Sequence, residues 1–203
     1  MIDLTPVTLD GRHVRLVPLS LDHVPGLWEM ADDWDIWELG MSAIRTEDDL
    51  RRYVEDALAM HAAGTALPFA TTDAATGRLI GSTRFGNVDA AHRRVEIGWT
   101  WIGRQWQRTP VNTVAKYLML RHAFETWGCV RVELKTDVLN QRSRNAMLRI
   151  GAKEEGVLRK HLITEMGRHR DSVYFSFVDD EWPAVKARLE EMLARPYPDP
   201  ARA

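Results

Sequence analysis

The sequence predicts a single α/β domain in which helices cover both faces of a mixed β-sheet. Strand-like and helix-like runs alternate along the chain, three strand-like runs follow one another in its middle, and 45% of the 203 residues are hydrophobic. A chain of this length and content can bury one sizeable core, and the length favours one domain over two. We therefore expect one domain over residues 1–195 and a disordered Pro-rich tail at 196–203.

The first half of the chain predicts a strand, two helical regions and two further strands. Apolar and polar residues alternate at 13–19, after an Asp-Gly turn. A helical region follows at 20–39 with a Pro-Gly pair in its middle, and a second helix at 46–64 has a cap and acidic residues in its first turn. Two strands joined by a turn are then expected at 67–72 and 78–85.

The second half continues the alternation of strands and helices. Val, Ile and Trp are frequent at 94–102, which we expect to be a strand, and helix formers without internal Gly or Pro fill 111–127. The last expected elements are a strand at 130–137, a short helix at 143–150 closed by Gly151, a strand at 172–178 and a helix at 180–194. This order of elements implies a mixed sheet with helices on both faces.

The junction between the strand at 94–102 and the helix at 111–127 is a candidate anion site. The N–H of the first helical residue has no partner within the helix, so Pro110, which has no N–H, suits this position. Thr109 is then the expected N-cap. The free N–H groups that follow would point out of the helix start, where the macrodipole adds partial positive charge. Many helices begin this way and bind nothing, so a capped helix start without a ligand is the alternative.

Composition limits the classes of partner and the cellular compartment. The net charge of -2 gives no general attraction to nucleic acid or to an anionic membrane. The chain has no run of 18 apolar residues, and its first residues lack the features of a secretory signal, so we expect a cytoplasmic protein without membrane attachment. Cys129 is the only cysteine, which excludes an internal disulfide and a cysteine-based metal cluster, and we expect no metal site.

A block after the strand at 130–137 carries the most specific motif in the chain. It reads Asn-x-Arg-Ser-x-x-Ala-x-x-x-x-Gly from Asn140 to Gly151. Together with the junction, this block resembles the GNAT N-acetyltransferase family, in particular its branch of ribosomal-protein N-terminal acetyltransferases (RimJ/RimL-like). The resemblance implies a splayed mixed sheet flanked by helices. It also implies an enzyme that transfers an acetyl group from acetyl-CoA to a primary amine by direct attack.

The resemblance assigns a cofactor site as well. The family motif Gln/Arg-x-x-Gly-x-Gly/Ala, which wraps the cofactor pyrophosphate, falls on residues 107–112, where Pro110 and Asn112 replace small residues. The end of the strand before it is expected to pair with the pantetheine arm. Instead of binding the cofactor, Asn140 could form the turn before the helix, and Arg142 could be a solvated arginine. The expected cofactor-binding residues are Trp101, Ile102, Gly103, Gln107, Arg108, Thr109, Val111, Asn112, Thr113, Asn140 and Arg142.

Three residues are candidates for the proton chemistry. Glu96, on the strand at 94–102, could take a proton from the incoming ammonium through water, or it could be a charge on a solvated face. Ser143 could protonate the leaving thiolate, although we also expect it to cap the helix that follows. Tyr174 could lie near the sulfur or simply pack in the sheet. In some family members, the position of Leu162 is a glutamate that acts as the general base. The adjacent His161 is expected to point to the opposite face of an extended segment.

The acceptor side is indicated by four carboxylates and two tryptophans at residues 31–38. Trp34, Trp37 and Glu38 would attract a cationic amine and pack against its apolar part, or the tryptophans could be core residues beside solvated acids. The acceptor would be a protein or peptide N-terminus or a small amine. An acyl-CoA-binding sensor without turnover, or a plain interaction domain, are the alternatives from other classes. A homodimer is also left open, because dimers are common among relatives.

Overall fold

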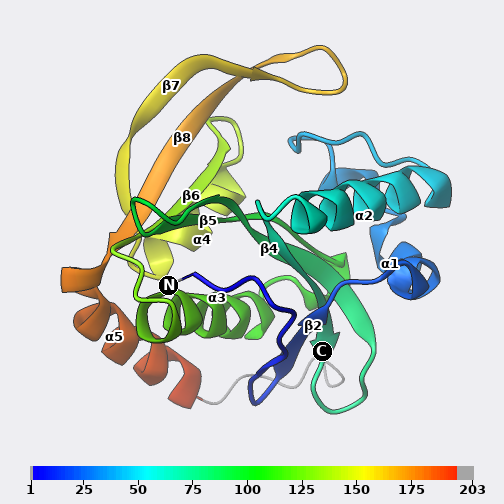
Figure 1. Ribbon diagram of the computed structural model, residues 1–203. Coiled ribbons are helices and arrows are strands. Elements are labelled where there is room, and N and C mark those ends of the chain that lie inside the picture. The colour runs from blue at the N-terminus through cyan, green and yellow to red at the C-terminus, as the bar shows by residue number, and fades with distance from the viewer. Residues whose placement is uncertain (1, 196–203) are drawn as a thin grey trace.

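The chain folds around one eight-stranded mixed sheet with the strand order β1-β2-β3-β4-β5-β6-β8-β7 (Figure 1). The computed structural model describes residues 2–195, so the predicted tail at 196–203 lies outside the described residues. Neighbouring strands are antiparallel except β5 and β6, which run parallel. The strands are β1 Leu9–Asp10, β2 Val14–Pro18, β3 Leu67–Asp73, β4 Leu79–Asp89, β5 Arg94–Ile102, β6 Arg131–Asp137, β7 Lys153–Ile163 and β8 His169–Val178.

Five α-helices are joined to this sheet within the described part of the chain. They are α1 Val24–Ala31, α2 Glu47–Ala62, α3 Val111–Arg121, α4 Gln141–Arg149 and α5 Trp182–Ala194. A π-helical turn, His122–Thr126, extends α3, which accounts for the longer helix that the sequence predicts. Within the described residues, none of the helices is both long and apolar enough to cross a membrane.

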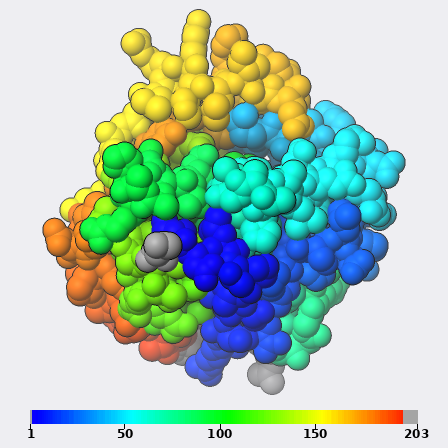
Figure 2. Space-filling view, in the orientation of Figure 1, coloured from blue at the N-terminus to red at the C-terminus, as the bar shows by residue number. Residues whose placement is uncertain are grey.

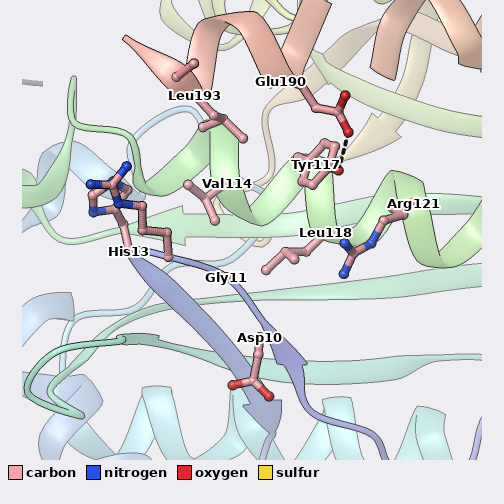
Figure 3. A pocket seen from close by; sticks show the side chains of 11 residues that line it. Asp10, Gly11, His13, Val114, Tyr117, Leu118, Arg121, Glu190 and Leu193 are labelled. Carbon is pink, nitrogen blue, oxygen red and sulfur yellow. Dashed lines mark hydrogen bonds between the residues drawn. The ribbon is translucent and has the colours of Figure 1, made fainter. Parts of the chain in front are cut away.

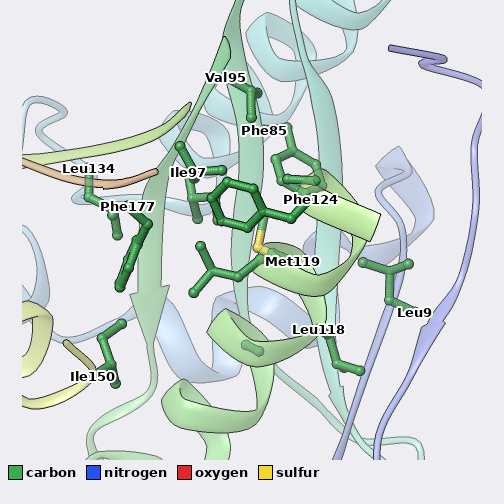
Figure 4. Packing of buried hydrophobic residues seen from close by; sticks show 14 of the residues in the cluster. Leu9, Phe85, Val95, Ile97, Leu118, Met119, Phe124, Leu134, Ile150 and Phe177 are labelled. Carbon is green, nitrogen blue, oxygen red and sulfur yellow. The ribbon is translucent and has the colours of Figure 1, made fainter. Parts of the chain in front are cut away.

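The two faces of the sheet are covered by different helices. Phe69 packs with residues of α3 and α5, whereas its neighbour Ala70 packs with residues of α1 and α2. Because consecutive strand residues point to opposite faces, the two helix pairs lie on opposite sides of the sheet. Figure 4 shows the α3 side, where Met119 of the helix lies among sheet residues such as Phe85 and Ile97. This packing fixes the start of α3 relative to the end of β5.

The predicted fold class is confirmed, but the sequence reading missed strand β7. The strand contains Lys153, Glu154, Arg159 and Lys160, and nearly all of its residues are exposed. It lies at the edge of the sheet, so it lacks the alternation of buried and exposed residues by which a strand is predicted. Its partner β8 correspondingly starts at His169, three residues before the predicted strand.

The sheet opens between its two parallel strands. The pairing of β5 with β6 ends at Glu96 opposite Glu133, although β5 continues to Ile102 and β6 to Asp137. On its other side, β5 has a bulge in which Trp99 and Thr100 lie opposite the single residue Thr83. Trp99 adopts a left-handed backbone with φ of 50°, and bulges of this kind bend and twist a strand. The edges of β5 and β6 therefore diverge beyond Glu96.

Candidate functional site

The start of α3 presents N–H groups next to the diverging strands. Val114 N–H donates to the carbonyl oxygen of Pro110 at 2.9 Å, and Val111 N–H donates to Thr109 Oγ1 at 3.3 Å. Among the described residues, the N–H groups of Asn112 and Thr113 have no hydrogen-bond partner. Two oriented donors at the positive end of a helix form a site that suits a phosphate group.

The N-cap of α3 lies one residue later than the sequence predicts. Pro110 is the N-cap rather than the first helical residue, because its carbonyl oxygen accepts the first helical hydrogen bond. Thr109 is therefore not the N-cap, although its hydroxyl still accepts the bond from Val111. The proline thus removes no N–H from the first helical turn.

The loop before α3 is fixed by hydrogen bonds to β5 and β4. Gln107 Nε2 donates to the carbonyl oxygen of Ile102 at 3.1 Å, and Gly103 N–H donates to that of Ile80 at 2.9 Å. Arg108 is exposed and has a left-handed backbone with φ of 62°. Arg108, one of the residues predicted to bind the cofactor, thus has its side chain in solvent. The side chain of Trp101, another of them, is buried in the core.

The C-terminal end of the motif at 140–151 is bonded to the start of α3. Arg149 Nη2 of α4 donates to Thr113 Oγ1 of α3 at 2.9 Å, which joins the last turn of one helix to the first turn of the other. Arg142 Nη2 donates to the carbonyl oxygen of Asp35 at 3.3 Å. Arg142 is thus exposed but held towards the segment that precedes α2.

Helix α4 starts two residues earlier than predicted. Asn140 is its N-cap, and its Oδ1 accepts from Ser143 N–H at 3.0 Å. Ser143 is therefore not the cap but a residue of the first turn. The capping bond uses the oxygen of Asn140 and leaves its amide N–H groups for another partner.

Glu96 lies at the point where β5 and β6 separate. The side chain is only 3% exposed, and its Oε2 accepts from Asn87 Nδ2 at 2.7 Å and from Lys135 Nζ at 2.5 Å. A Cβ on Gly98 would lie 2.7 Å from Glu96 Oε1, so this position must be glycine for the carboxylate to keep its place. Glu96 is consequently a paired, buried carboxylate and not a solvated surface charge.

Tyr174 of β8 belongs to the same group of side chains. It lies opposite Lys135 in the sheet, and Lys135 Nζ is 5.8 Å from the ring centres of both Tyr174 and Trp99. Burial and the nearby carboxylate of Glu96 raise the pKa of Tyr174, which keeps its hydroxyl protonated. The hydroxyl is thus available as a proton donor beside Glu96.

His161 faces this group, contrary to the sequence prediction. Its ring lies 5.6 Å from that of Tyr174 in an edge-to-face arrangement. The pairing of β7 with β8 is irregular between Leu158 and Leu162, and Lys160 has a left-handed backbone with φ of 49°. This bulge breaks the alternation from which the opposite orientation is predicted. Burial and the charges of Lys135 and Arg170 lower the pKa of His161.

Sequence reasoning missed three basic residues around β5. Lys135 pairs with Glu96, and Arg84 is buried between the rings of Tyr53 and Trp99, 4.9 and 5.0 Å from their centres. Lys116 of α3 is 5% exposed and donates from Nζ to Thr100 Oγ1 at 2.7 Å, and burial lowers its pKa to about 7. A lysine inside the apolar face of α3 is the one signal that the sequence offered.

Several acidic and aromatic side chains of the segment at 31–38 already have partners within the protein. Trp37 is buried against Tyr53 and Trp101, and its Nε1 donates to the carbonyl oxygen of Ala31. Asp33 and Asp35 both bind Arg104, which lowers the pKa of Asp33. The guanidinium of Arg45 covers the ring of Trp34 at 4.1 Å, and Glu38 is exposed. Two of the four carboxylates thus share one arginine, which reduces the negative charge that the segment presents.

A pocket of about 390 Å³ lies apart from these residues, between α3, α5 and the turn after β1 (Figure 3). Tyr117 Oη donates there to Glu190 Oε1 at 2.8 Å, and Val114 and Leu118 supply part of the apolar wall. Its lining includes neither the free N–H groups of α3 nor Glu96. We therefore do not assign the cofactor or acceptor to this pocket.

Diverging parallel strands beside a helix start define the acetyltransferase fold that the motifs resemble. Comparison with known proteins agrees, because residues 13–153 match the model of the Acetyltransferase (GNAT) domain. The chain belongs to this family, so the predicted family is confirmed.

Two relatives illustrate the match. The Bacillus subtilis (strain 168) protein named Putative ribosomal N-acetyltransferase YdaF is 36% identical over 110 residues, which cover 54% of this chain and 59% of that protein. The match thus spans less than two thirds of YdaF. A GCN5-related N-acetyltransferase from Brucella melitensis is 30% identical, with a TM-score of 0.86 over 94% of this chain and 86% of that one.

One similar structure contains a cofactor derivative. Mycobacterium smegmatis RimJ in complex with CoA-disulfide has a TM-score of 0.80 over 95% of this chain and 97% of that one, at 23% identity. At this identity the likeness concerns the fold.

Proposed function

We propose that the protein transfers the acetyl group of acetyl-CoA to a primary amine, at a peptide or protein N-terminus or on a small molecule. The observation that carries this proposal is the end of the β5–β6 pairing at Glu96, next to two free N–H groups at the start of α3. A cofactor that is both a phosphate ester and a chain of amides has partners on both features. The name of YdaF, Putative ribosomal N-acetyltransferase, favours a protein amine over a small molecule among the acceptors.

The residues around the helix start suit the cofactor. The N–H groups of Asn112 and Thr113 would bind the pyrophosphate, with Arg108 as an exposed cation beside them. The edge of β5 that no longer pairs with β6 beyond Glu96 would pair with the pantetheine amides, and the amide of Asn140 would add a donor. Acetyl-CoA, when bound, supplies an activated acetyl group as a thioester.

Glu96 is the residue we propose for deprotonating the amine. An ammonium must lose a proton before it can attack a carbonyl carbon, and Glu96 Oε1 is free of the bonds that Lys135 and Asn87 make to Oε2. The proton would pass to this oxygen directly or through one water. Tyr174 Oη is the proposed donor to the leaving sulfur, and Ser143 of α4 is a second candidate for the same step.

The test is thiol release by the purified protein with acetyl-CoA and a panel of peptides and small amines. We expect acceptor-dependent release of free thiol together with an acetylated product detected by mass spectrometry. Measurable binding of CoA without turnover on any acceptor would instead favour an acyl-CoA sensor. Failure to bind CoA would reject both functions. Light scattering on the same sample tests whether the active species is a homodimer.

A further inference from the structure

The face of the sheet opposite α3 carries three neighbouring polar side chains with unpartnered atoms. Arg170 and Ser172 lie two positions apart on β8 and are 6% and 0% exposed, and His161 of β7 packs against Tyr174, the next residue of β8 on the same face. Arg170 Nε, Ser172 Oγ and His161 Nδ1 are buried and have no hydrogen-bond partner among the described residues. Leaving a buried donor unpaired is unfavourable, and a buried unpaired charge more so.

Of the other cations on this face, Arg84 lies between two aromatic rings, and two more are paired with carboxylates. Lys135 binds Glu96, and Arg168 Nη2 binds Asp137 Oδ2 at 2.5 Å. The charge of Asp137 acts on Arg170 as well, but its Oδ1 already accepts from the N–H of Leu139 at 2.9 Å. Arg170 forms no salt bridge within residues 2–195, so its guanidinium is the cation on β8 that an external anion can satisfy.

The cofactor phosphates are poor candidates for that anion. Val173 and Phe175 pack in the core on the α3 side, and Arg170, Ser172 and Tyr174 alternate with them along β8. They therefore lie on the face of the sheet opposite α3. Since the free N–H groups are at the start of α3, the other reactant is the better source of an anion for Arg170.

The β7–β8 hairpin brings this cluster over the Glu96 side of the sheet. Glu165 N–H donates to the carbonyl oxygen of Met41 at 3.1 Å, and Ala43 N–H donates to Glu165 Oε2 at 2.7 Å. The hairpin arches from the edge of the sheet towards the segment before α2 (Figure 1), and the two lie next to each other on the surface (Figure 2). An acceptor beside Glu96 would thus lie under the hairpin that carries Arg170.

We propose that Arg170, together with Ser172 and His161, binds a carboxylate of the acceptor close to its reacting amine. This inference rests on the proposed acetyltransferase function. The carboxylate comes either from Asp or Glu in the first two positions of a peptide or from the α-carboxylate of a free amino acid. A guanidinium and a hydroxyl are suited to a carboxylate, since both donate hydrogen bonds to its oxygens.

Matched peptides test this proposal. We compare kcat/KM for Ser-Asp and Ser-Asn N-terminal peptides, which differ by one charge at nearly equal size, and for free serine as the amino-acid arm. The wild-type protein should prefer the Asp peptide by about 10- to 100-fold. Preference for free serine over serinamide, with no Asp preference, would assign the site to an α-carboxylate. Equal rates in both pairs would overturn the proposal.

Two variants locate the preference. Arg170→Gln should reduce the ratio of the two rates to about one, because the neutral amide no longer distinguishes Asp from Asn. Arg159→Gln, at an exposed position of β7, is the matched control and should keep the wild-type ratio. Should Arg170→Gln fail to fold, Ser172→Ala replaces it and should lower the ratio in part. An unchanged ratio in the folded variant would contradict the role of the cluster.

Acetyl transfer and carboxylate recognition can fail separately. Absence of turnover on any acceptor would reject the proposed function itself. Turnover with equal rates for charged and uncharged acceptors would leave acetyl transfer intact and reject only the role of Arg170.

Discussion

Two regions of the molecule differ in kind. The cofactor edge is formed by the end of β5 and the start of α3. The polar face is formed by the residues of β5, β6 and β8 that lie on the side of the sheet opposite α3. At the cofactor edge, main-chain groups are the free donors, as at Asn112 and Thr113. On the polar face, side chains such as Glu96, Lys135 and Arg170 carry the chemistry. The first region depends on where elements begin and end, whereas the second depends on how strands are aligned.

The difference predicts how each region responds to substitution. A main-chain donor survives most side-chain changes, so the cofactor edge should tolerate many of them. A buried ion pair does not, because removing one partner leaves the other charge uncompensated. The polar face should therefore be the more sensitive of the two.

The largest effect is expected for Glu96→Gln on the polar face. Loss of the carboxylate should lower kcat by about 10²- to 10⁴-fold and abolish the rise of rate with pH, since glutamine cannot accept the proton. The affinity for CoA, measured by calorimetry, should stay within about threefold of wild type, because the N–H groups of α3 are unchanged.

A second variant controls for Lys135, which loses its partner in Glu96→Gln. The double variant Glu96→Gln, Lys135→Met removes the unpaired charge and should regain stability in urea unfolding without regaining activity. A wild-type pH profile in either protein would exclude Glu96 as the base.

The next effect concerns Lys116, the buried lysine beneath the β5 bulge. Its pKa is about 7 in the folded protein against an ordinary value of 10.5, so between these values the unfolded chain binds more protons. The contribution of Lys116 to stability should therefore rise with pH from about 7 to 10.5, by at most about 1.4 kcal/mol per pH unit, and be constant below 7. Lys116→Met should remove this slope.

Urea unfolding at several pH values measures the slope, with Lys153→Met as a control at an exposed position of β7. Equal slopes in wild type and Lys116→Met would show that the burial of this lysine does not govern stability. A loss of CoA affinity in the same variant would show that Lys116, through Thr100, supports the cofactor edge as a side chain.

A smaller effect is expected from deleting one main-chain donor. Asn112→Pro removes an N–H in the first helical turn, where proline is tolerated, and should weaken CoA binding by about tenfold. Asn112→Ala keeps the N–H and should bind CoA almost as wild type does. Thermal midpoints within a few degrees of each other would show that both variants keep the helix. Equal losses of affinity would mean that the side chain, and not the main chain, binds the cofactor.

The smallest effect is expected for Arg104→Gln, which frees Asp33 and Asp35. Exposed ion pairs contribute little to stability, so the thermal midpoint should move by no more than about 2 °C. Restored negative charge should lower the KM of a cationic acceptor by about twofold at low ionic strength, and salt should abolish the change. An unchanged KM would remove the acidic segment from the acceptor path.

The same contrast explains how far the sequence alone could lead. The junction and the Asn140–Gly151 block could be located because cap residues, proline and motif spacing act locally. Even there, each helix start was misplaced by one or two residues, since a proline carbonyl and an asparagine side chain provide the caps. Local signals thus predicted the cofactor edge and its approximate boundaries.

The polar face could not be predicted in the same way. Lys135 meets Glu96 only because β5 and β6 are aligned in parallel over three residues, and His161 turns inward only because of a bulge in β7. Neither the alignment nor the bulge has a local signal in the sequence. The burial of Arg170 could not be predicted either, because residues distant in the sequence surround it.

Amide hydrogen exchange with and without CoA tests the central distinction most directly. We expect slower exchange in peptides that cover 97–103 and 111–118, where main-chain N–H groups would bind the cofactor, and unchanged exchange in the hairpin at 157–171. Unchanged exchange at the start of α3, with slower exchange confined to the hairpin, would contradict it.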